Sequence, residues 1–547
     1  MKPSHLLRLA PLVCASLVLA ACSSAAGTGS SAKTPGAGDL VVMTPAATSN
    51  LDKVTWNEPE GEPATIDPYL SVDYTPNTIN SNMCENLMAY YPDYSFKPNL
   101  ASSAANPDPL TWVYTLRSGV TFWDGSPMTS DDVAYSLNRN LKDAGSFYHY
   151  LYSSVKSVDV TGPLEVTVHL TKPDYLFNKE MADYAGVVVQ KKFALAHPKD
   201  MGSPNVGLMC TGPYQFKSWT KGDNITMTAY PGYWDNANRK PKVSTIVFKF
   251  LTDEAAQTSA LQTGDIDGMY DPPLSGLTQL KASSEGKLFY GPMDSNLTIV
   301  YSNPKGSMGN LKMRQALQLA TDWDGMAKVI MKGTATPIKA MFPPNVFDDA
   351  KAQLQPAYDA LPPVQSGSID KAKALVAAAG EDGKKPVVFA VGGTFTGIQF
   401  GNSVVDAAKK AGMNASLKVV PAAEYGGYLY DPKTRAGVDI LFTDFWPNIP
   451  NALDWVGITS ATGGSFNQYG YNGIDSLYDQ ARATADPAEQ GKIQAQIMTK
   501  LTDELLTMAP GLSRASRLFM NKRVTGAPAS FSYVYFPWAV YLGGTGS

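Results

Sequence analysis

The chain has 547 residues, of which 44% are hydrophobic and 17% are charged, and its formal net charge at pH 7 is −4. A single hydrophobic core does not usually extend over so long a chain, so the length predicts at least two lobes. The composition is that of an ordinary globular protein, and the slightly acidic balance gives no sign of a nucleic-acid surface.

The N-terminus has the pattern of an export signal. A basic start precedes an apolar run over residues 9–20 that is too short to form a stable membrane span, and residues 19–22 read Leu-Ala-Ala-Cys. This tetrapeptide resembles a bacterial lipobox, which implies that residues 1–21 are removed and that Cys22 is acylated. Residues 22–51 would then be the lipid-bearing cysteine and a flexible tether. An ordinary signal peptide with an incidental cysteine is the alternative.

Cysteine use fits an exported protein. Cys14 would leave with the signal peptide and Cys22 would be acylated, so only Cys84 and Cys210 remain in the mature body. Two remaining cysteines in an exported chain favour one disulfide bond. Two buried free thiols are the alternative.

The body begins with an expected strand at residues 54–57 and a helix that starts with Thr75 as N-cap and Pro76 in the first turn. Its apolar face is formed by Ile79, Met83 and Leu87. The sequence therefore predicts that this helix carries Cys84.

The next expected elements are a strand at residues 112–117 and a helix after Thr129. Asp132 stands three residues after Thr129, which is the spacing of a capping box with Asp in place of the usual Glu or Gln. Two further strands at 155–160 and 164–170 are joined by a Gly-Pro turn. Residues 210–267 then read as turn, strands and helix, with strands at 225–228 and 245–250 and a helix at 254–263.

From residue 297 onward, strands and helices alternate in the way that is typical of βαβ units. The expected strands are 297–303, 386–391 and 417–420, and the expected helices are 313–322, 371–379, 404–410, 474–483 and 487–506.

Two segments resemble a known family. Residues 210–267 contain Gly-Pro-Tyr-Gln-Phe, Tyr-Trp and Ala-Leu-Gln-Thr-Gly-Asp-Ile-Asp in that order, and residues 112–136 read WVYTLRSGVTFWDGSPMTSDDVAYS. In order and spacing, both resemble signatures of the extracytoplasmic solute-binding proteins of the oligopeptide and dipeptide type. The resemblance covers about residues 52–545.

The resemblance implies an α/β, two-lobe periplasmic-binding-protein-like fold with an extra subdomain inserted in lobe I. Lobe I would comprise residues 52–92, 207–297 and 510–547, with residues 93–206 as its inserted subdomain. Lobe II would comprise residues 298–509, and crossovers near 297 and 509 would form a hinge. A bond between Cys84 and Cys210 would staple the base of the subdomain.

The resemblance also implies a ligand site at Asp444. In peptide-binding members, a carboxylate at the end of a strand binds the α-ammonium group of the ligand, and the matching run here is residues 442–448. Phe442, Phe445 and Trp446 flank this carboxylate, which suits an ammonium ion in a region of low dielectric. The alternative is that Asp444 caps a loop and the aromatic rings belong to the core. Asn448 replaces the second acid of the family motif.

The implied function is capture of oligopeptides or dipeptides between the lobes and delivery to an ABC permease and its ATPase. The protein would be a monomer, would lie outside the cytoplasm on the lipid anchor, and would have no cofactor, metal or nucleic-acid partner. A haem, nickel-complex or oligosaccharide ligand is the alternative, because other members of the fold bind these. No HExxH, Walker or Gly-x-Ser-x-Gly motif is present, so the sequence predicts that the chain is not an enzyme, and an exported hydrolase is a weaker alternative.

Overall fold

The computed structural model describes residues 39–505 and 507–546. The expected signal peptide and Cys22 lie outside the described residues. Part of the expected tether is described, and it is bound to the body. The Val41 amide donates to the Tyr290 carbonyl at 2.8 Å, and the Thr44 hydroxyl donates to the Ala527 carbonyl at 2.8 Å. The packed chain therefore begins about ten residues before the expected start at residue 52.

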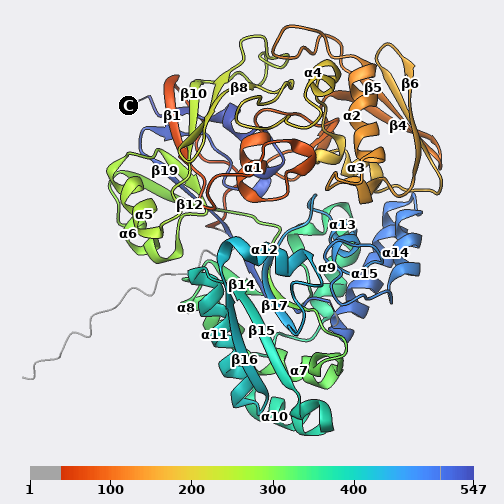
Figure 1. Ribbon diagram of the computed structural model, residues 1–547, viewed down its shortest axis with the longest axis vertical. Coiled ribbons are helices and arrows are strands. Elements are labelled where there is room, and N and C mark those ends of the chain that lie inside the picture. The colour runs from red at the N-terminus through yellow and green to blue at the C-terminus, as the bar shows by residue number, and fades with distance from the viewer. Residues whose placement is uncertain (1–38, 506, 547) are drawn as a thin grey trace, which may run out of the picture. The chain divides into compact units, whose positions relative to one another are not determined.

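Lobe I is organised by a seven-stranded sheet (Figure 1). Its strands, in spatial order, are β12 (Gly286–Gly291), β19 (Ser516–Asn521), β11 (Gly268–Tyr270), β1 (Leu51–Asn57), β10 (Val243–Lys249), β9 (Asn224–Ala229) and β8 (Tyr214–Thr220). The helices of this lobe are α1 (Tyr74–Asn80), α5 (Glu254–Thr263) and α6 (Leu277–Lys281). Two short strand pairs accompany them, β2 (Met88–Tyr90) with β3 (Phe96–Pro98) and β20 (Val524–Thr525) with β21 (Gly543–Gly544).

A four-stranded antiparallel sheet forms a separate layer within residues 93–206. Its order is β4 (Ala101–Asp108), β5 (Thr111–Leu116), β7 (Glu165–Leu170) and β6 (Val155–Gly162). Helix α2 (Ser130–Lys142) lies against this sheet, and the predicted capping box between Thr129 and Asp132 is present. The same segment contains α3 (Phe177–Glu180) and α4 (Lys191–Ala196).

Lobe II is organised by a six-stranded sheet. Its order is β14 (Ala335–Pro337), β18 (Leu512–Arg514), β13 (Asn296–Tyr301), β17 (Ile440–Phe445), β15 (Pro386–Gly392) and β16 (Asn414–Val420). Strand β15 is parallel to both β16 and β17, as the predicted βαβ pattern requires. The helices are α7 (Leu311–Ala320), α8 (Trp323–Val329), α9 (Lys351–Ala360), α10 (Ile369–Ala378), α11 (Phe395–Lys410), α12 (Ala422–Tyr430), α13 (Ala452–Thr459), α14 (Asp475–Arg482) and α15 (Pro487–Glu504).

Short 3-10 helices connect these elements. They are Pro68–Leu70, His149–Tyr152, Tyr184–Gly186, Leu274–Gly276, Ser307–Gly309, Pro344–Val346, Asp348–Ala350, Gly380–Lys384, Phe531–Val534 and Trp538–Tyr541.

The chain passes between the two large sheets twice. The first passage lies between β12 and β13, close to the expected crossover near residue 297. The second lies at Ala515, between β18 and β19, a few residues later than the expected position at 509. The sequence indicates a turn between the lobes at the Pro-Gly pair of residues 510–511. In the structure, the chain after this pair forms strand β18, which pairs with β13 and β14 and so still belongs to lobe II. A three-residue strand is too short to show a periodic pattern in the sequence.

The first helix is shorter than the sequence indicates. Helix α1 ends at Asn80 and its N-cap position is Asp73, so Thr75 is not the cap and Cys84 is not on the helix. Met83 and Leu87 are fully buried nonetheless. Met83 lies in the turn after α1, and Leu87 lies directly before strand β2. Both side chains are buried in the same core as the helix, so their spacing resembles that of a longer helix, and periodicity alone does not distinguish the two cases.

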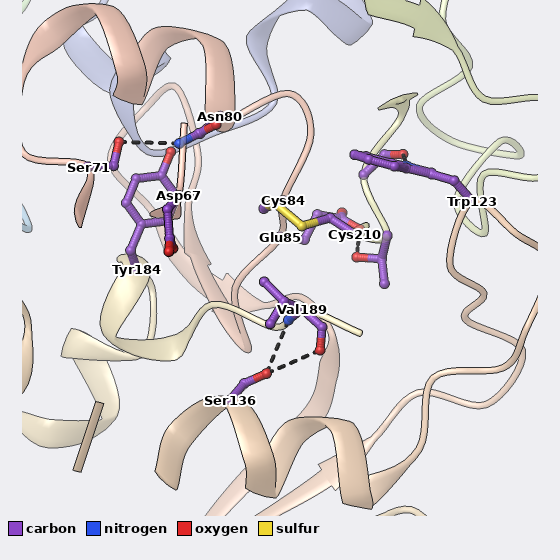
Figure 2. The surroundings of a disulfide bond; sticks show 12 residues. Asp67, Ser71, Asn80, Cys84, Glu85, Trp123, Ser136, Tyr184, Val189 and Cys210 are labelled. Carbon is purple, nitrogen blue, oxygen red and sulfur yellow. Dashed lines mark hydrogen bonds between the residues drawn. A yellow bond between two sulfur atoms is a disulfide. The ribbon is translucent and has the colours of Figure 1, made fainter. Parts of the chain in front are cut away.

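The predicted disulfide bond between Cys84 and Cys210 is confirmed (Figure 2). The sulfur atoms are 2.02 Å apart and the Cα atoms 5.0 Å apart, and both residues are buried. The bond joins the turn after α1 to the segment just before β8. Because residues 93–206 leave and return between these two points, the bond closes the base of the four-stranded subdomain.

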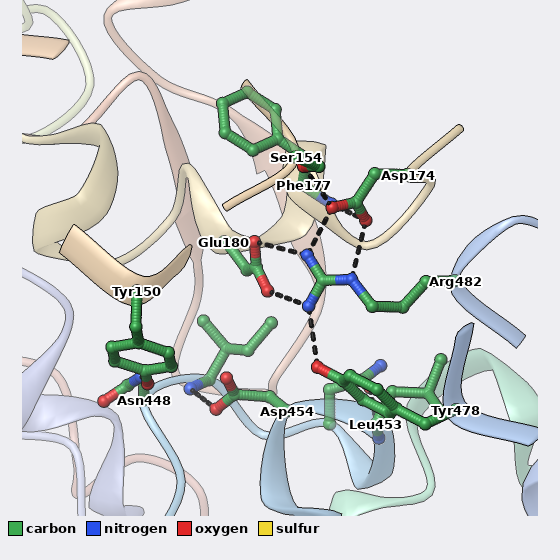
Figure 3. A network of polar contacts seen from close by, with 12 residues as sticks. Tyr150, Ser154, Asp174, Phe177, Glu180, Asn448, Leu453, Asp454, Tyr478 and Arg482 are labelled. Atoms are coloured by element: carbon green, nitrogen blue, oxygen red, sulfur yellow. Dashed lines mark hydrogen bonds and ion pairs between the residues drawn. The ribbon is translucent and has the colours of Figure 1, made fainter. Parts of the chain in front are cut away.

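A buried charge network connects that subdomain to lobe II (Figure 3). The Arg482 guanidinium, at the end of α14, donates to Asp174 Oδ1 from Nε at 3.0 Å and to Glu180 Oε1 from Nη1 at 2.9 Å. Arg482 also donates to the Tyr478 hydroxyl at 2.8 Å, and the side chains of Asp174 and Glu180 are each only 1% exposed. Nearby on the surface, Lys172 pairs with Asp479 at 2.8 Å.

Candidate ligand-binding site

A cavity of about 1500 Å³ is lined by residues of both lobes. Lobe I contributes residues that follow β1 and β11 together with α1 and α5, and the subdomain contributes Phe147, Tyr148 and Asp183. Lobe II contributes residues 392–396 after β15 and residues 442–446 at the end of β17. The carboxyl ends of parallel strands are where open α/β sheets bind ligands, so the topology supports this cavity as the ligand site.

Asp444, the predicted ligand-binding carboxylate, lines this cavity from the end of strand β17, and its side chain is 24% exposed. It already has a protein cation as partner. Oδ2 accepts a hydrogen bond from Arg514 Nε at 2.7 Å and lies 2.6 Å from Arg514 Nη2. The Tyr74 hydroxyl donates to the same oxygen at 3.4 Å. Oδ1 has no hydrogen-bond partner within the described part of the chain.

Arg514 connects the two lobes at the cavity wall. From β18 of lobe II, its Nη1 donates to Asp271 Oδ1 of lobe I at 2.7 Å, and its Nη2 donates to the Tyr74 hydroxyl at 2.8 Å. Burial alone would lower the pKa of Arg514, but Asp271 and Asp444 outweigh it and hold that pKa well above its ordinary value. The two carboxylates therefore favour the charged form of Arg514.

Asp271 is held in a costly backbone conformation. Its φ is 49°, in the left-handed region that non-glycine residues rarely adopt, and its amide donates to the Arg517 carbonyl at 2.8 Å. Burial would raise its pKa, but Arg514 and Arg517 outweigh burial and lower the pKa below its usual range. Asp271 Oδ1 lies 3.3 Å from Arg517 Nη2. Asp444, Arg514, Asp271 and Arg517 thus form a row of alternating charges.

The cavity also contains carboxylates for which the described residues provide no ion-pair partner. Glu60 and Asp73 both line it and are exposed to it. Enclosure by protein raises the pKa of Glu60 to about 8, and the neighbouring carboxylates Asp73, Asp271 and Asp444 add to this rise. Burial also raises the pKa of Asp73. Other carboxylates of the lining, Asp253, Glu254, Asp271 and Asp444, outnumber its two arginines, which favours a ligand with a positive charge.

The three aromatic residues predicted for the site lie in different surroundings. The Trp446 ring is half-buried at the cavity and its centroid is 4.1 Å from that of Tyr74. Phe445 is 7% exposed and packs against Trp455 and Phe466, and Phe442 is 9% exposed and packs on Phe400. These two rings thus belong mainly to the core, as the alternative interpretation held, although both residues border the cavity. Asn448, the replacement in the motif, donates to the Tyr150 hydroxyl.

Sequence reasoning did not find four residues of this site. These are Tyr74, Asp271, Arg514 and Arg517. A signal for the two arginines is present, because they interrupt an otherwise apolar and small-residue segment, residues 509–520, that reads as buried strand. A charged side chain in such a segment needs a buried partner or a ligand.

Other kinds of site are not indicated within residues 39–505 and 507–546. No group of three or more His, Cys, Asp or Glu side chains is placed to hold a metal ion there. In the same residues, no helix combines the length and the apolar character needed to cross a bilayer.

Two lobes with a chain crossover between them and a charged cavity at their junction define a solute-binding protein of the two-lobe class. The particular family follows from the sequence comparison. The family model described as bacterial extracellular solute-binding proteins, family 5, matches residues 95–467, and the chain belongs to this family.

Individual relatives are more distant. The glutathione-binding protein GsiB of Salmonella paratyphi A is 27% identical over 301 residues, which are 53% of this chain and 58% of that protein. GsiB of Escherichia coli K12 is 26% identical over 284 residues, which are 52% of this chain and 54% of that protein. The chain therefore spans little more than half the length of the curated relatives it matches.

Solved structures share the fold across nearly the whole chain. DppA of Helicobacter pylori in complex with a peptide has a TM-score of 0.78 at 18% identity and covers 91% of this chain and 98% of that one. AppA of Bacillus subtilis with a nonapeptide gives 0.77 at 20%, covering 91% and 99%. NikA of Staphylococcus aureus with Ni(L-His)2 gives 0.73 at 19%, covering 88% and 98%. At such identities the likeness establishes the two-lobe α/β fold and not the ligand.

Proposed function

We propose that this protein is the substrate-binding component of an ABC importer and that it captures peptides with a free amino terminus in the cavity between its lobes. The closed form then docks on a membrane permease, and the ATPase of the importer drives uptake. One observation carries the choice of ligand: Asp444 Oδ1 is an acceptor without a partner among the described side chains, at the carboxyl end of β17, in an acidic cavity.

The surroundings of Asp444 suit a cationic group. Arg514 and Tyr74 fix Oδ2, so the carboxylate keeps one orientation and a ligand does not have to order it. The α-ammonium group of a peptide is a three-fold donor that forms charge-assisted hydrogen bonds to carboxylates. The half-buried Trp446 ring beside Asp444 presents an aromatic face on the same wall of the cavity. A cation near that face gains further attraction.

The comparisons are in keeping with a peptide ligand. GsiB carries glutathione in its name, and the DppA and AppA structures contain peptides. A non-peptide cation complex is the second candidate, because the same carboxylates suit it and the related NikA structure contains Ni(L-His)2.

The cellular setting is also proposed. The basic start, short apolar run and Leu-Ala-Ala-Cys of residues 19–22 support removal of residues 1–21 and lipid attachment at Cys22. The protein would then face the outside of the cell membrane as a monomer. The disulfide bond between Cys84 and Cys210 fits an oxidising compartment.

Calorimetric titration with short peptides, free and N-acetylated, tests the peptide assignment. We expect Asp444→Asn to weaken binding of the free peptide by about 2 to 5 kcal/mol, or roughly 30-fold to several thousand-fold, because it leaves the ligand cation without its counter-ion. Acetylation should cause a similar loss, and the two losses should not add. The matched control is Asp479→Asn, because Asp479 is exposed on the surface away from the cavity lining. We expect this control to leave peptide affinity unchanged. Equal affinity for both peptide forms would refute the assignment.

A further inference from the structure

The boundary between the inserted subdomain and lobe II contains more buried acid than base. Asp174, Glu180 and Asp183 belong to the subdomain and Asp454 to α13 of lobe II, and each of the four is between 1% and 3% exposed. Within residues 39–505 and 507–546, Arg482 is the only cation that forms an ion pair with any of them. A buried carboxylate without a counter-ion is costly, so this boundary favours protonated acids.

The contacts of Arg482 distinguish two of these acids (Figure 3). Asp174 accepts a hydrogen bond from Arg482 Nε at 3.0 Å. It also accepts from the Ser154 hydroxyl at 2.7 Å and from the Phe177 amide at 3.3 Å. Several donors around one carboxylate favour its ionised form, so Asp174 is the natural counter-ion of Arg482. Glu180, at 2.9 Å from Nη1, is then a second acid on a cation that Asp174 already neutralises.

The other two acids form no ion pair among the described residues. Asp454 Oδ2 accepts a hydrogen bond from the Ile449 amide at 3.1 Å, and Asp183 lies beside the Tyr184 amide. Glu180 and Asp183 on the subdomain interact electrostatically with Asp454 on lobe II. If all four acids were ionised, the boundary would hold four negative charges and one positive charge, and the negative charges would repel one another across it.

We propose that this boundary is a pH-sensitive switch, in which Glu180, Asp183 and Asp454 hold protons while the subdomain and lobe II are in contact and lose them when the lobes separate. Acidic pH would then favour the closed form, with or without ligand, and closure around a ligand would take up protons. The inference rests on the lobe movement of the proposed function and not on the identity of the ligand.

The electrostatics of the three acids agree with this geometry. Burial raises the pKa of Glu180 to about 8; Arg482 opposes the rise, and Asp174 and Asp454 add to it. Burial also raises the pKa of Asp454 to about 7, against nearby hydrogen-bond donors, and it raises the pKa of Asp183. These values lie above those of solvated carboxylates. Contact across the boundary is therefore favoured below about pH 7 and loses this support as pH rises through 7 to 8.

The other ionisable groups around these acids do not titrate in this range. Burial raises the pKa of each surrounding tyrosine, so these hydroxyls stay neutral; the tyrosines are Tyr90, Tyr114, Tyr148, Tyr150, Tyr152, Tyr184, Tyr478 and Tyr535. Burial would lower the pKa of Lys179 on α3, but Asp348 and Asp349, at 2.6 and 2.7 Å, outweigh it. Burial likewise fails to lower the pKa of Arg482, because Asp174 and Glu180 raise it.

The boundary adjoins the ligand cavity. Asp183 and Tyr148 line the cavity from the subdomain, and Asn448 lines it from lobe II. The Asn448 side chain donates to the Tyr150 hydroxyl, which is a further contact across the boundary. The acids therefore lie where the subdomain and lobe II would close over a ligand, so their protonation acts on the same movement as ligand binding.

Small-angle X-ray scattering of the ligand-free mature protein at pH 6 and pH 8.5 tests the switch. We expect a smaller radius of gyration at pH 6, because protonated acids allow the boundary to close. Glu180→Gln with Asp454→Asn imitates the protonated acids, so this double variant should keep the smaller radius at both pH values. Asp479 is exposed and pairs with Lys172 at the same boundary, so Asp479→Asn is the matched control and should keep the wild-type pH dependence.

Equal radii of the wild-type protein at the two pH values would overturn the switch, and so would an unchanged pH dependence in the double variant. If the double variant does not fold, the wild-type comparison still decides.

Calorimetric titration with a pool of random free tripeptides gives a second readout. The pKa of Glu180 alone predicts affinity about tenfold or more lower at pH 8 than at pH 6.5. Deprotonation of the peptide amine contributes only about twofold at pH 8. This effect and the titration of Glu60 are also present in the double variant, so the difference between the two proteins isolates the boundary.

The two experiments separate this inference from the proposed function. Peptide binding with the same pH dependence in the wild type and the double variant would overturn the switch and leave the proposed function standing. A radius that depends on pH as expected, together with failure of the free tripeptides to bind, would support the switch and overturn the peptide assignment.

Discussion

Removal of Arg482 should strongly destabilise the contact between the inserted subdomain and lobe II. In Arg482→Met, Asp174 and Glu180 lose their shared cation while each remains about 1% exposed (Figure 3). Replacing one member of a buried ion network typically costs about 3 to 5 kcal/mol, because an uncompensated charge stays buried. The exposed pair of Lys172 and Asp479 joins the same parts of the chain, so Lys172→Met is the matched control and should cost at most about 1 kcal/mol.

The assay is chemical and thermal unfolding of the mature protein at pH 5 and pH 8, with proteolysis between the subdomain and lobe II as a second readout. The loss in Arg482→Met should be smaller at pH 5. Burial raises the pKa of Glu180 to about 8 even though Arg482 works against this rise, so without the arginine Glu180 binds a proton still more readily in the folded state as pH falls, and the penalty declines.

Replacing all three charges together sharpens the test. Asp174→Asn, Glu180→Gln and Arg482→Met in one chain should recover much of the lost stability, since a neutral buried cluster avoids the isolated charges. If Arg482→Met loses no more stability than Lys172→Met, the buried network contributes no more than a surface pair and the reasoning is refuted. If the loss is the same at both pH values, the protonation argument is refuted.

Three further predictions concern other parts of the chain. The double variant Cys84→Ala with Cys210→Ala should lose up to about 5 kcal/mol of stability, since the cysteines are 126 residues apart and the bond restricts the unfolded chain; two titratable thiols in the unreduced, denatured wild-type protein would contradict the bond. Glu60 has a folded pKa of about 8, above its unfolded value, so its contribution is fully present below about pH 4.5 and stability falls as pH rises toward 8; Glu60→Gln should flatten the stability curve of the ligand-free protein between these values, and an unchanged curve would rule this out. Cys22→Ala should abolish lipid labelling in the bacterial host, and normal labelling would exclude the anchor.

Local patterns in the sequence were sufficient for most elements of the fold. The helix expected at residues 254–263 is α5 with the same bounds, and the capping box at Thr129 is present. Such elements depend on residues that are close in sequence, so spacing and end signals define them. The sequence predicts too long a helix at α1, because Met83 and Leu87 after the helix are buried at positions where a longer helix would also have placed apolar residues.

The candidate site was only partly accessible to such reasoning. Asp444 stands at a strand end and its position was predictable from the motif. Its partner Arg514 is 70 residues away, and Asp271 and Tyr74 come from the other lobe. These contacts arise from the way two lobes meet, and no periodic pattern in the sequence encodes that arrangement. Burial of Phe442 and Phe445 likewise depends on rings contributed by α11, α13 and the loop before α14.

The crossover at Ala515 has a consequence for how the charges of the cavity wall respond to lobe movement. Arg514 moves with the strand on one side of this residue and Arg517 moves with the strand on the other, so a change in the angle between lobes alters the spacing of the two arginines directly. Asp444 belongs to the first group and Arg517 to the second. The ion pair between Arg514 and Asp271 crosses from lobe II to lobe I next to this crossover, so separation of the lobes would stretch or break it.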